Sequence, residues 1–310
     1  MPGIVRRRET KYEISANEYV SLVGAVSKYL PRFEFKPGRP YTHISTVYYD
    51  TEGQKFFNRA VRHYESSLKL RLKEYYYNSA SGGTETTPYC FVELKERANG
   101  EVHKRRLRIP KELVGEFFER QAIWEQLVAR DPGIEFQDST HEIYDELDKF
   151  LKSNCVRPSS VINYRRVVYQ KDERDLRITF DDQLQVFQPV HGLFGAIDAL
   201  TCERLDAPIC DIPSRIMEIK SVGSYPKWLD EALGSYCPRK MSKFTTSVDF
   251  LNSHLPGRPG ANGNGNGVSS ADRVQHDGDR GRGGGVEEPD KRGGVKRKVN
   301  DAEASRPDAS

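Results

Sequence analysis

The sequence predicts an α+β fold in which an antiparallel β-sheet with one strongly basic face is flanked by helices. Three observations predict this fold. Basic and apolar residues alternate with a period of two in several segments, amphipathic helical segments lie between them, and the composition of the 310 residues, 36% hydrophobic and 30% charged, is typical of a globular protein. A formal net charge of only +3 excludes a histone-like polybasic chain.

The alternation is clearest where leucines separate Lys69, Arg71 and Lys73. A period of two places the two residue types on opposite faces of a β-strand. The same pattern, less cleanly in some cases, is found in residues 9–14, 92–97, 104–109, 177–181 and 217–220. One such strand is best explained by a sheet with one face in water. Because six strands share the pattern, we expect their charged residues to form one functional surface.

Basic residues outnumber acidic residues on this face. The basic residues are Lys11, Lys69, Arg71, Lys73, Lys95, Arg97, Lys104, Arg106, Arg165, Arg177 and Lys220. The acidic residues are Glu9, Glu13, Glu93, Asp181 and Glu218. Such a surplus favours an anionic partner. If the sheet closes, the basic faces line a tunnel and the apolar faces pack under helices. Converging ammonium and guanidinium groups suit polyphosphate, which offers only oxygen acceptors.

Helices are predicted between the strands. Ser15 can cap a helix that runs to Leu30, and Glu18 would complete a capping box. Further helices are predicted over residues 110–128, 138–152 and 226–236. Asp181, next to Asp182, is expected to begin a turn at the end of its strand.

The composition changes near Pro256, so we expect one folded domain over residues 1–255 and a disordered Gly/Asn-rich tail over 256–310. The tail contains 12 of the 25 glycines and no aromatic residue. Its basic run, Lys291 to Lys298, is better explained as solvated chain than as a nucleic-acid site, and we expect no sequence-specific nucleic-acid partner.

The sequence favours a cytoplasmic protein. It contains no run of 18 apolar residues, and no apolar stretch follows the basic N-terminal residues, so neither a transmembrane helix nor a secretory signal is expected. The five cysteines are scattered and form no C-x-x-C pair, which argues against structural zinc and a disulfide framework.

Between Arg6 and Leu251, the segments taken in order resemble VTC domains. The motifs are RRRETKYEI, HISTVYYDT, LKLRLKEYY, FVELKER, HKRRLRI, NYRRVVY, LRITFD, IMEIK and MSKFTTSVDF, read as a series of strand motifs. VTC domains belong to the triphosphate tunnel enzymes, together with CYTH-type phosphatases and cyclases. The resemblance implies a closed, eight-stranded antiparallel barrel that makes polyphosphate from ATP with Mn²⁺ or Mg²⁺. It also implies a membrane-protein partner that this chain does not encode.

The resemblance and the basic face together indicate the site residues. The expected catalytic residues are Lys69, Arg71, Lys95 and Arg177. The expected phosphate-binding residues are Lys11, Lys104, Arg106, Arg165, Lys220 and Lys243. The expected metal ligand is Glu218, for which the alternative is an ion pair with a basic residue of a neighbouring strand. In the family, an arginine often occupies the place of Lys69. The alternation of residue types around Arg165 is unclear, which leaves open whether Arg165 or Arg166 faces inward.

Three functions remain open at this level. The first is an ATP-dependent polyphosphate polymerase, the second a hydrolase of tripolyphosphate or nucleoside triphosphates, and the third a non-catalytic module that binds polyphosphate or inositol pyrophosphate. A polymerase needs no general base because its acceptor phosphate is already ionised. A hydrolase must activate water, and Glu9, Glu13 and Glu93 are the candidate bases.

Overall fold

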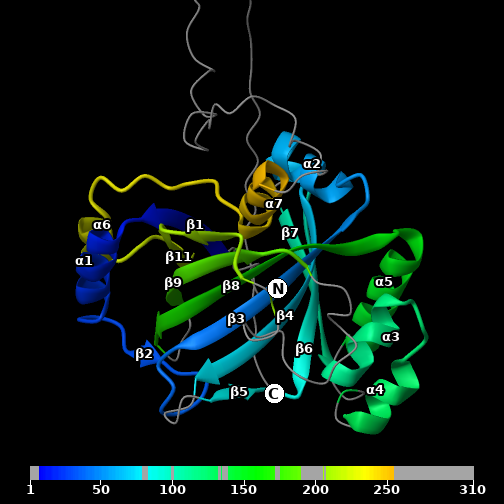
Figure 1. Ribbon diagram of the computed structural model, residues 1–310. Helices are drawn as coiled ribbons and strands as arrows, with labels where there is room; N and C mark the ends of the chain where they lie inside the picture. Colours follow the sequence, from blue (N-terminus) through cyan, green and yellow to red (C-terminus); the bar gives the residue numbers. More distant parts are fainter. Residues whose placement is uncertain are drawn as a thin grey trace, which may run out of the picture. The chain divides into compact units, whose positions relative to one another are not determined.

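In the residues that the structure describes, an antiparallel sheet of eleven strands forms the framework (Figure 1). The computed structural model describes residues 7–78, 83–98, 101–131, 134, 139–171, 175–189, 205 and 207–254, and the predicted tail lies outside these residues. The strands are β1 (Arg7–Ile14), β2 (Arg32–Phe33), β3 (Thr42–Thr51), β4 (Leu68–Asn78), β5 (Thr84–Thr86), β6 (Tyr89–Ala98), β7 (Glu101–Pro110), β8 (Val156–Gln170), β9 (Leu176–Phe187), β10 (Cys210–Ile212) and β11 (Arg215–Val222).

Eight strands follow one another in the order β1-β11-β9-β8-β3-β4-β6-β7, and the three short strands add to β8, β4 and β9. The sheet is curled but open: within the described residues β1 and β7, at the two ends of the order, are not paired with each other. The expectation of a closed barrel was therefore wrong at this seam. The free edge of β1 is bonded instead by the segment before the last helix, where the Arg239 backbone N–H donates to the Lys11 carbonyl at 2.8 Å.

Helices cover the outside of the curl in two groups and close one end of it (Figure 1). The α-helices are α1 (Ala16–Val26), α2 (Lys55–Arg62), α3 (Val114–Phe118), α4 (Trp124–Arg130), α5 (Thr140–Ser153), α6 (Lys227–Leu233) and α7 (Lys243–His254), and the 3₁₀ helices are η1 (Tyr64–Ser66) and η2 (Lys111–Leu113). In Figure 1, α1 and α6 lie on one side, α3 to α5 on the other, and α2 and α7 at the top.

Two apolar clusters stabilise the curl from outside. One lies under α1 and α6 and contains Leu22, Val26, Met217, Ile219 and Leu229. The other extends from the strands to α2, α7 and the helices α3 to α5, and includes Leu70, Leu107, Phe117, Leu147 and Phe244. Burial of apolar side chains on the outer faces leaves the alternate, charged positions to face the inside of the curl.

Most predicted helices are found, with differences in their limits. The capping box of α1 is confirmed: Glu18 N–H donates to Ser15 Oγ at 3.3 Å, and Ser15 N–H to Glu18 Oε2 at 2.6 Å. The helix predicted over residues 110–128 is instead broken into η2, α3 and α4, because Arg120 adopts a left-handed conformation with φ of 67° after α3. The prediction of a strand for the motif MSKFTTSVDF is wrong, because most of this motif forms the first part of helix α7.

None of the helices in the described parts of the chain is both long and apolar enough to cross a bilayer. Four of the five cysteines lie in the described residues, and these four are free thiols: Cys90, Cys155, Cys210 and Cys237.

Candidate phosphate-binding site

The inner face of the curled sheet gathers the predicted basic residues. On β4, Lys69 and Arg71 alternate with leucines that are at most 7% exposed on the outer face. The register then continues the inner face across the neighbouring strands, because residues directly opposite each other point to the same side. Across β4, β6 and β7 the opposed inner positions run Lys69, Lys95, Lys104 and Arg71, Glu93, Arg106. Across β1, β11 and β9, Lys11 lies opposite Glu218, and Lys220 lies opposite both Glu9 and Arg177. We call this surface the inner face.

Glu93 is the centre of a first cluster on the inner face. Its carboxylate is 1% exposed and contacts Arg71 Nη2 at 2.6 Å, Lys104 Nζ at 2.9 Å and Arg106 Nε at 3.3 Å. Burial alone would raise the pKa of Glu93, but Arg71, Lys73 and Lys104 lower it far below its ordinary value. Glu93 is therefore an ionised internal counter-ion that positions three cations, a role that the sequence did not reveal.

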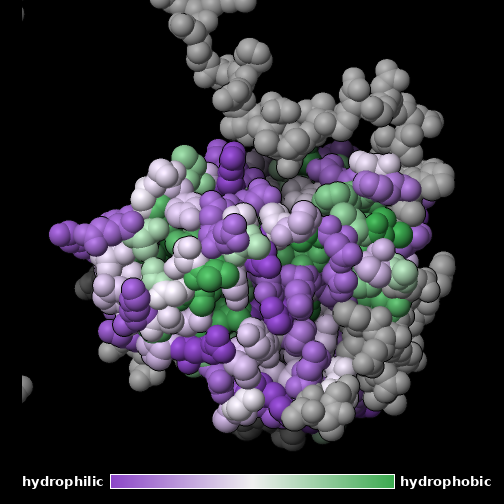
Figure 2. Space-filling view, turned by 60° about the vertical axis from the view of Figure 1, so that its left-hand side comes forward, coloured by the Kyte–Doolittle hydropathy of each residue, from purple (hydrophilic) through white to green (hydrophobic). Residues whose placement is uncertain are grey.

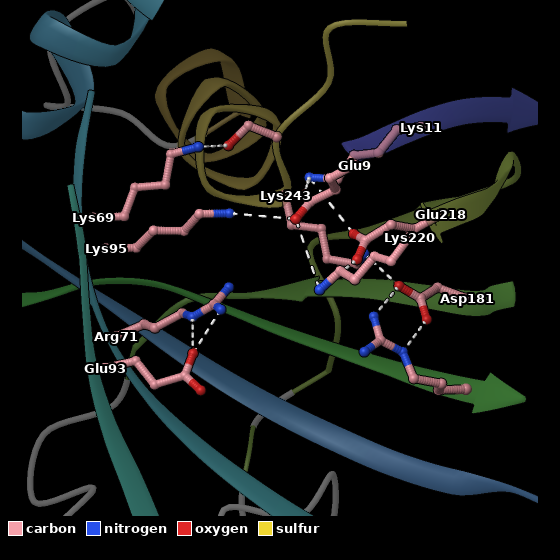
Figure 3. A network of polar contacts seen from close by, with 12 residues as sticks. Glu9, Lys11, Lys69, Arg71, Glu93, Lys95, Asp181, Glu218, Lys220 and Lys243 are labelled. Carbon is pink, nitrogen blue, oxygen red and sulfur yellow. Dashed lines mark hydrogen bonds and ion pairs between the residues drawn. The ribbon is translucent and has the colours of Figure 1, made fainter. Parts of the chain in front are cut away.

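A second cluster joins β1, at one end of the strand order, to β6, which is next to the other end. Glu218 lies 3.1 Å from Lys220 Nζ and 3.7 Å from Lys11 Nζ, so it forms the ion pairs considered as its alternative role. Glu9 contacts Lys11 at 3.2 Å and Lys220 at 3.7 Å. Lys95 Nζ, from β6, reaches Glu9 on β1 at 3.8 Å (Figure 3). This contact shows how strongly the sheet curls, because it spans the inside from one end of the order to near the other.

Asp181 anchors a third cluster in the middle of β9. It is 0% exposed, receives both Arg166 Nε and Nη2 at 2.6 and 2.7 Å, and accepts from Lys243 Nζ of α7 at 2.6 Å (Figure 3). Burial raises the pKa of Asp181, but Arg166 and Lys243 lower it further than burial raises it. The expected turn at Asp181 was wrong, since β9 continues to Phe187.

Arg165 is the predicted site residue that does not join the others. Its guanidinium binds Asp182 through two hydrogen bonds of 2.9 and 2.6 Å and lies 4.4 Å from the centre of the Tyr41 ring, on the opposite face from Arg166. The ladder between β8 and β9 is irregular near Gln183, whose φ is 51°. Two adjacent arginines thus pair with two adjacent aspartates on opposite faces. Arg166, not Arg165, faces inward.

Two lysines of β4, the half-buried Lys69 and the buried Lys73, have no carboxylate within ion-pair distance in the described residues. Lys69 Nζ donates to Ser242 Oγ at 2.9 Å, and burial followed by repulsion from Lys11 and Lys95 lowers its pKa to about 7. Lys73 is 6% exposed, and burial followed by Arg71 lowers its pKa well below the ordinary value. Buried cations without counter-ions are costly unless an anion is bound beside them.

Lys69 also lines a pocket at one end of the inner face. The lining residues are Glu9, Lys11, Tyr64, Ser67, Lys69, Lys95, Arg97 and Met241. Four of these eight side chains are basic and one is acidic, so the pocket suits an anion. Hydrophilic side chains also form a band between hydrophobic areas on the face shown in Figure 2.

The donor chemistry of Glu218 and Glu9 fits a hard divalent ion. Both carboxylates contact Lys11 and Lys220. Burial raises the pKa of Glu218, but Lys11 and Lys220 hold it well below its ordinary value, so this carboxylate is ionised. No group of three or more His, Cys, Asp or Glu side chains suited to a metal is found in the described ranges. An Mg²⁺ or Mn²⁺ ion held by Glu218 would therefore take its other oxygens from phosphate and water.

Comparisons with known proteins agree with the sequence motifs. The chain is 22% identical over 269 residues to vacuolar transporter chaperone complex subunit 4 of Schizosaccharomyces pombe, covering 78% of this chain and 36% of the relative. It is 22% identical over 280 residues to the subunit of the same name in Trypanosoma brucei brucei, covering 81% and 35%. The chain thus spans about a third of the length of these curated relatives.

Among solved structures, a Hippeastrum protein named as an adenylyl cyclase, and described with a dominant triphosphatase activity, is 15% identical. The match covers 79% of this chain and 96% of that protein with a TM-score of 0.43. The family model described as the VTC domain matches residues 6–252, which is most of the chain. The protein belongs to the VTC domain family.

Proposed function

We propose that the protein is an ATP-dependent polyphosphate polymerase that transfers the γ-phosphoryl group of ATP to a polyphosphate chain bound along the inner face. The observation that carries the proposal is the inner face itself, in which seven strands and α7 bring basic side chains together. Lys73 is buried there and Lys69 is half-buried, and neither has a carboxylate within ion-pair distance in the described residues. A bound polyanion would supply the counter-charge that these lysines lack.

The fixed positions of the cations support phosphoryl transfer. This reaction needs little covalent chemistry from the protein; it needs alignment of the phosphates and neutralisation of charge on their oxygens. Glu93 holds Arg71 and Lys104, while Glu9 holds Lys95, so these cations are oriented before a ligand arrives. Preorganised cations lower the reorganisation needed in the transition state.

The protonation of the carboxylates favours transfer to phosphate over hydrolysis. A general base for water needs a pKa near the working pH. The cations of the inner face lower the pKa of Glu93, and although burial and Glu218 raise that of Glu9, Lys11 and Lys95 bring it below its ordinary value. These two candidate bases are therefore weak, whereas an acceptor phosphate is already ionised.

A divalent ion, when bound at Glu218, would neutralise charge on the transferred phosphoryl group and its leaving group. We propose Mn²⁺ or Mg²⁺ as this ion. ATP and polyphosphate are the proposed ligands, residues 1–255 the catalytic domain, and a membrane protein the partner that would place the activity in a complex. The site would then work in the cytoplasm, and nothing in the inner face selects a nucleic-acid sequence.

The product made from ATP tests the proposal. The purified chain is incubated with ATP and Mn²⁺, and the products are separated on a polyacrylamide gel. The proposal expects a ladder of long polyphosphate that requires the divalent ion. Orthophosphate alone would identify a hydrolase, and tight binding of triphosphate without turnover would identify a binding module; either result contradicts the proposal.

Glu218→Gln separates binding from turnover. The substitution keeps the shape of the side chain but removes the charge that a divalent ion needs, so kcat should fall by roughly 10²-fold. The affinity for inorganic tripolyphosphate, measured by calorimetry without metal, should be unchanged or higher because one negative charge has left the inner face. A variant that makes polyphosphate at the wild-type rate would place the metal elsewhere.

A further inference from the structure

An exposed aromatic ring, that of Phe35, lies just after β2 and beside Arg177 of the inner face. Phe35 is 47% exposed, although it lies beside a sheet that buries most of its large apolar side chains. The guanidinium carbon of Arg177 lies 5.4 Å from the centre of this ring. Arg177 is directly opposite Lys220, and Lys220 contacts Glu218 at 3.1 Å. Arg177 and Lys220 therefore connect the exposed Phe35 ring to Glu218, where phosphoryl transfer is proposed.

The Phe35 ring is held in place by the segment around it. Phe33 meets it edge to face at 5.1 Å, and β2 is paired with β8 through Phe33 and Val168. The turn that follows is closed by the Gly38 N–H, which donates to Glu34 Oε2 at 2.7 Å, and Gly38 has the positive φ of 74° that this turn requires. An exposed ring that is fixed in this way is preorganised for a contact with a flat ligand.

The same turn is also anchored to the neighbouring hairpin. Lys36 forms an ion pair with Glu85 on β5, and Arg39 Nη2 lies 3.7 Å from the same carboxylate. In Figure 1, β2 and β5 lie at the lower end of the sheet, away from α7. The ring is thus part of a braced rim at the end of the inner face opposite to α7.

A buried hydrogen-bond acceptor without a partner in the described residues, the side-chain oxygen of Gln170, also lies on the inner face near β2. Gln170 is 5% exposed, and its Oε1 atom has no hydrogen-bond partner in the described part of the chain. Gln170 is directly opposite Arg177, and it is two residues from Val168, which is opposite Phe33; these side chains therefore share the inner face. A buried amide oxygen without a donor costs free energy, so a ligand that brings an N–H group would satisfy it.

We infer that this rim is the binding site for the adenine of ATP, with Phe35 as the stacking surface and Gln170 as the acceptor for the exocyclic amino group. The inference rests on the proposed function, since it places the remainder of the ATP molecule. An aromatic face beside a guanidinium is the usual surface for a nucleobase, and a glutamine amide matches the amino edge of adenine. Arg177, between the ring and Lys220, lies where the phosphates nearest the nucleoside would pass.

Calorimetric titrations with ATP, inosine triphosphate and inorganic tripolyphosphate test this site. Inosine triphosphate carries a carbonyl where ATP has the amino group, and tripolyphosphate lacks the nucleoside altogether. In the wild type, ATP should bind at least about fivefold more tightly than inosine triphosphate. Phe35→Ala should weaken both nucleotides by at least about fivefold and leave tripolyphosphate within twofold, whereas Phe35→Trp should retain the ATP affinity.

Two further variants complete the test. Gln170→Leu, of similar volume, should remove the preference for ATP over inosine triphosphate without changing tripolyphosphate binding. Tyr29→Ala, at a ring on the α1 side that is 50% exposed, is the matched control and should change none of the affinities. Equal weakening of ATP and tripolyphosphate by Phe35→Ala, or wild-type ATP and inosine triphosphate affinities that are equal, would overturn the inference. These outcomes concern binding alone, so they are distinct from a failure to synthesise polyphosphate.

Discussion

The charge of Lys69 depends on what is bound beside it. Its nitrogen donates to Ser242, but the surrounding charges that act on it are the cations Lys11, Lys95, Arg71 and Arg97. Because burial and these cations lower the pKa of Lys69 to about 7, the amine is partly neutral near neutral pH in the free protein. A bound polyanion would favour the charged form and raise that pKa. Arginine at this position would stay charged throughout.

The pH dependence of binding should therefore differ between the wild type and Lys69→Arg. Below pH 7 the amine is already protonated. Above pH 7 it must take up a proton when the anion binds, so the wild-type affinity for tripolyphosphate should fall by up to about tenfold more per pH unit than that of the variant. Titrations at pH 6.0, 7.5 and 8.5 measure this, and the ligand's own titration is common to both proteins. Parallel profiles would show that Lys69 keeps its charge throughout.

At the scale of single elements, the sequence predicted the strands well because the alternation is a direct property of each strand. The outer leucines of β4 and the inner Lys69 and Arg71 lie as predicted. The alternation could not order Arg165 and Arg166, since both are basic and each has its own aspartate on its own face. The role of Glu93 was also not predictable, because it depends on three cations that come from two neighbouring strands.

Asp181 joins α7 to the sheet through its contacts with Lys243 and Arg166, and the loss of these contacts should lower the thermal stability. Asp181→Asn leaves Arg166 and Lys243, whose side chains are only 15% and 13% exposed, around a neutral amide, which should lower the free energy of unfolding by about 3 kcal/mol or more. Tm should fall by roughly 6 °C or more. The matched control is Asp182→Asn on the opposite face, where the carboxylate pairs with Arg165, whose side chain is 26% exposed. A Tm for Asp181→Asn at or above that of Asp182→Asn would contradict the claim that Asp181 stabilises the packing of α7 on the sheet.

At the scale of the whole chain, the fold class followed from the alternation, whereas the open seam did not. Whether β1 pairs with β7 depends on what bonds the edge of β1, and that partner, Arg239, is more than 200 residues away in the sequence. The same limit applies to the inner face, which exists only once distant strands are placed side by side. Residues 256–310 contribute no apolar core by composition, so we expect them to be dispensable for the chemistry.

A chain truncated after Leu255 tests this expectation. Its rate of polyphosphate synthesis should stay within about twofold of the full chain, because every proposed site residue precedes the cut. The circular dichroism spectrum and Tm of the truncated chain serve as controls for folding. Loss of synthesis by a chain that remains folded would assign the tail a direct role in the reaction.

The central claim is that the charged inside of the curled sheet is the polyanion site, and two neighbouring arginines of β7 test it. Arg106 faces inward, contacts Glu93 and lies 3.9 Å from the centre of the Phe91 ring, while Arg105 faces outward and pairs with Glu146 and Glu96. Both side chains are partly exposed, at 38% and 28%, so neither substitution should unfold the protein.

The measurement is the calorimetric affinity for inorganic tripolyphosphate in metal-free buffer. Arg106→Ala should weaken binding by about tenfold, as expected for the loss of one charge-assisted contact, and Arg105→Ala should leave it unchanged. Equal affinities in the two variants, or a larger loss in Arg105→Ala, would contradict the claim that the phosphates bind inside.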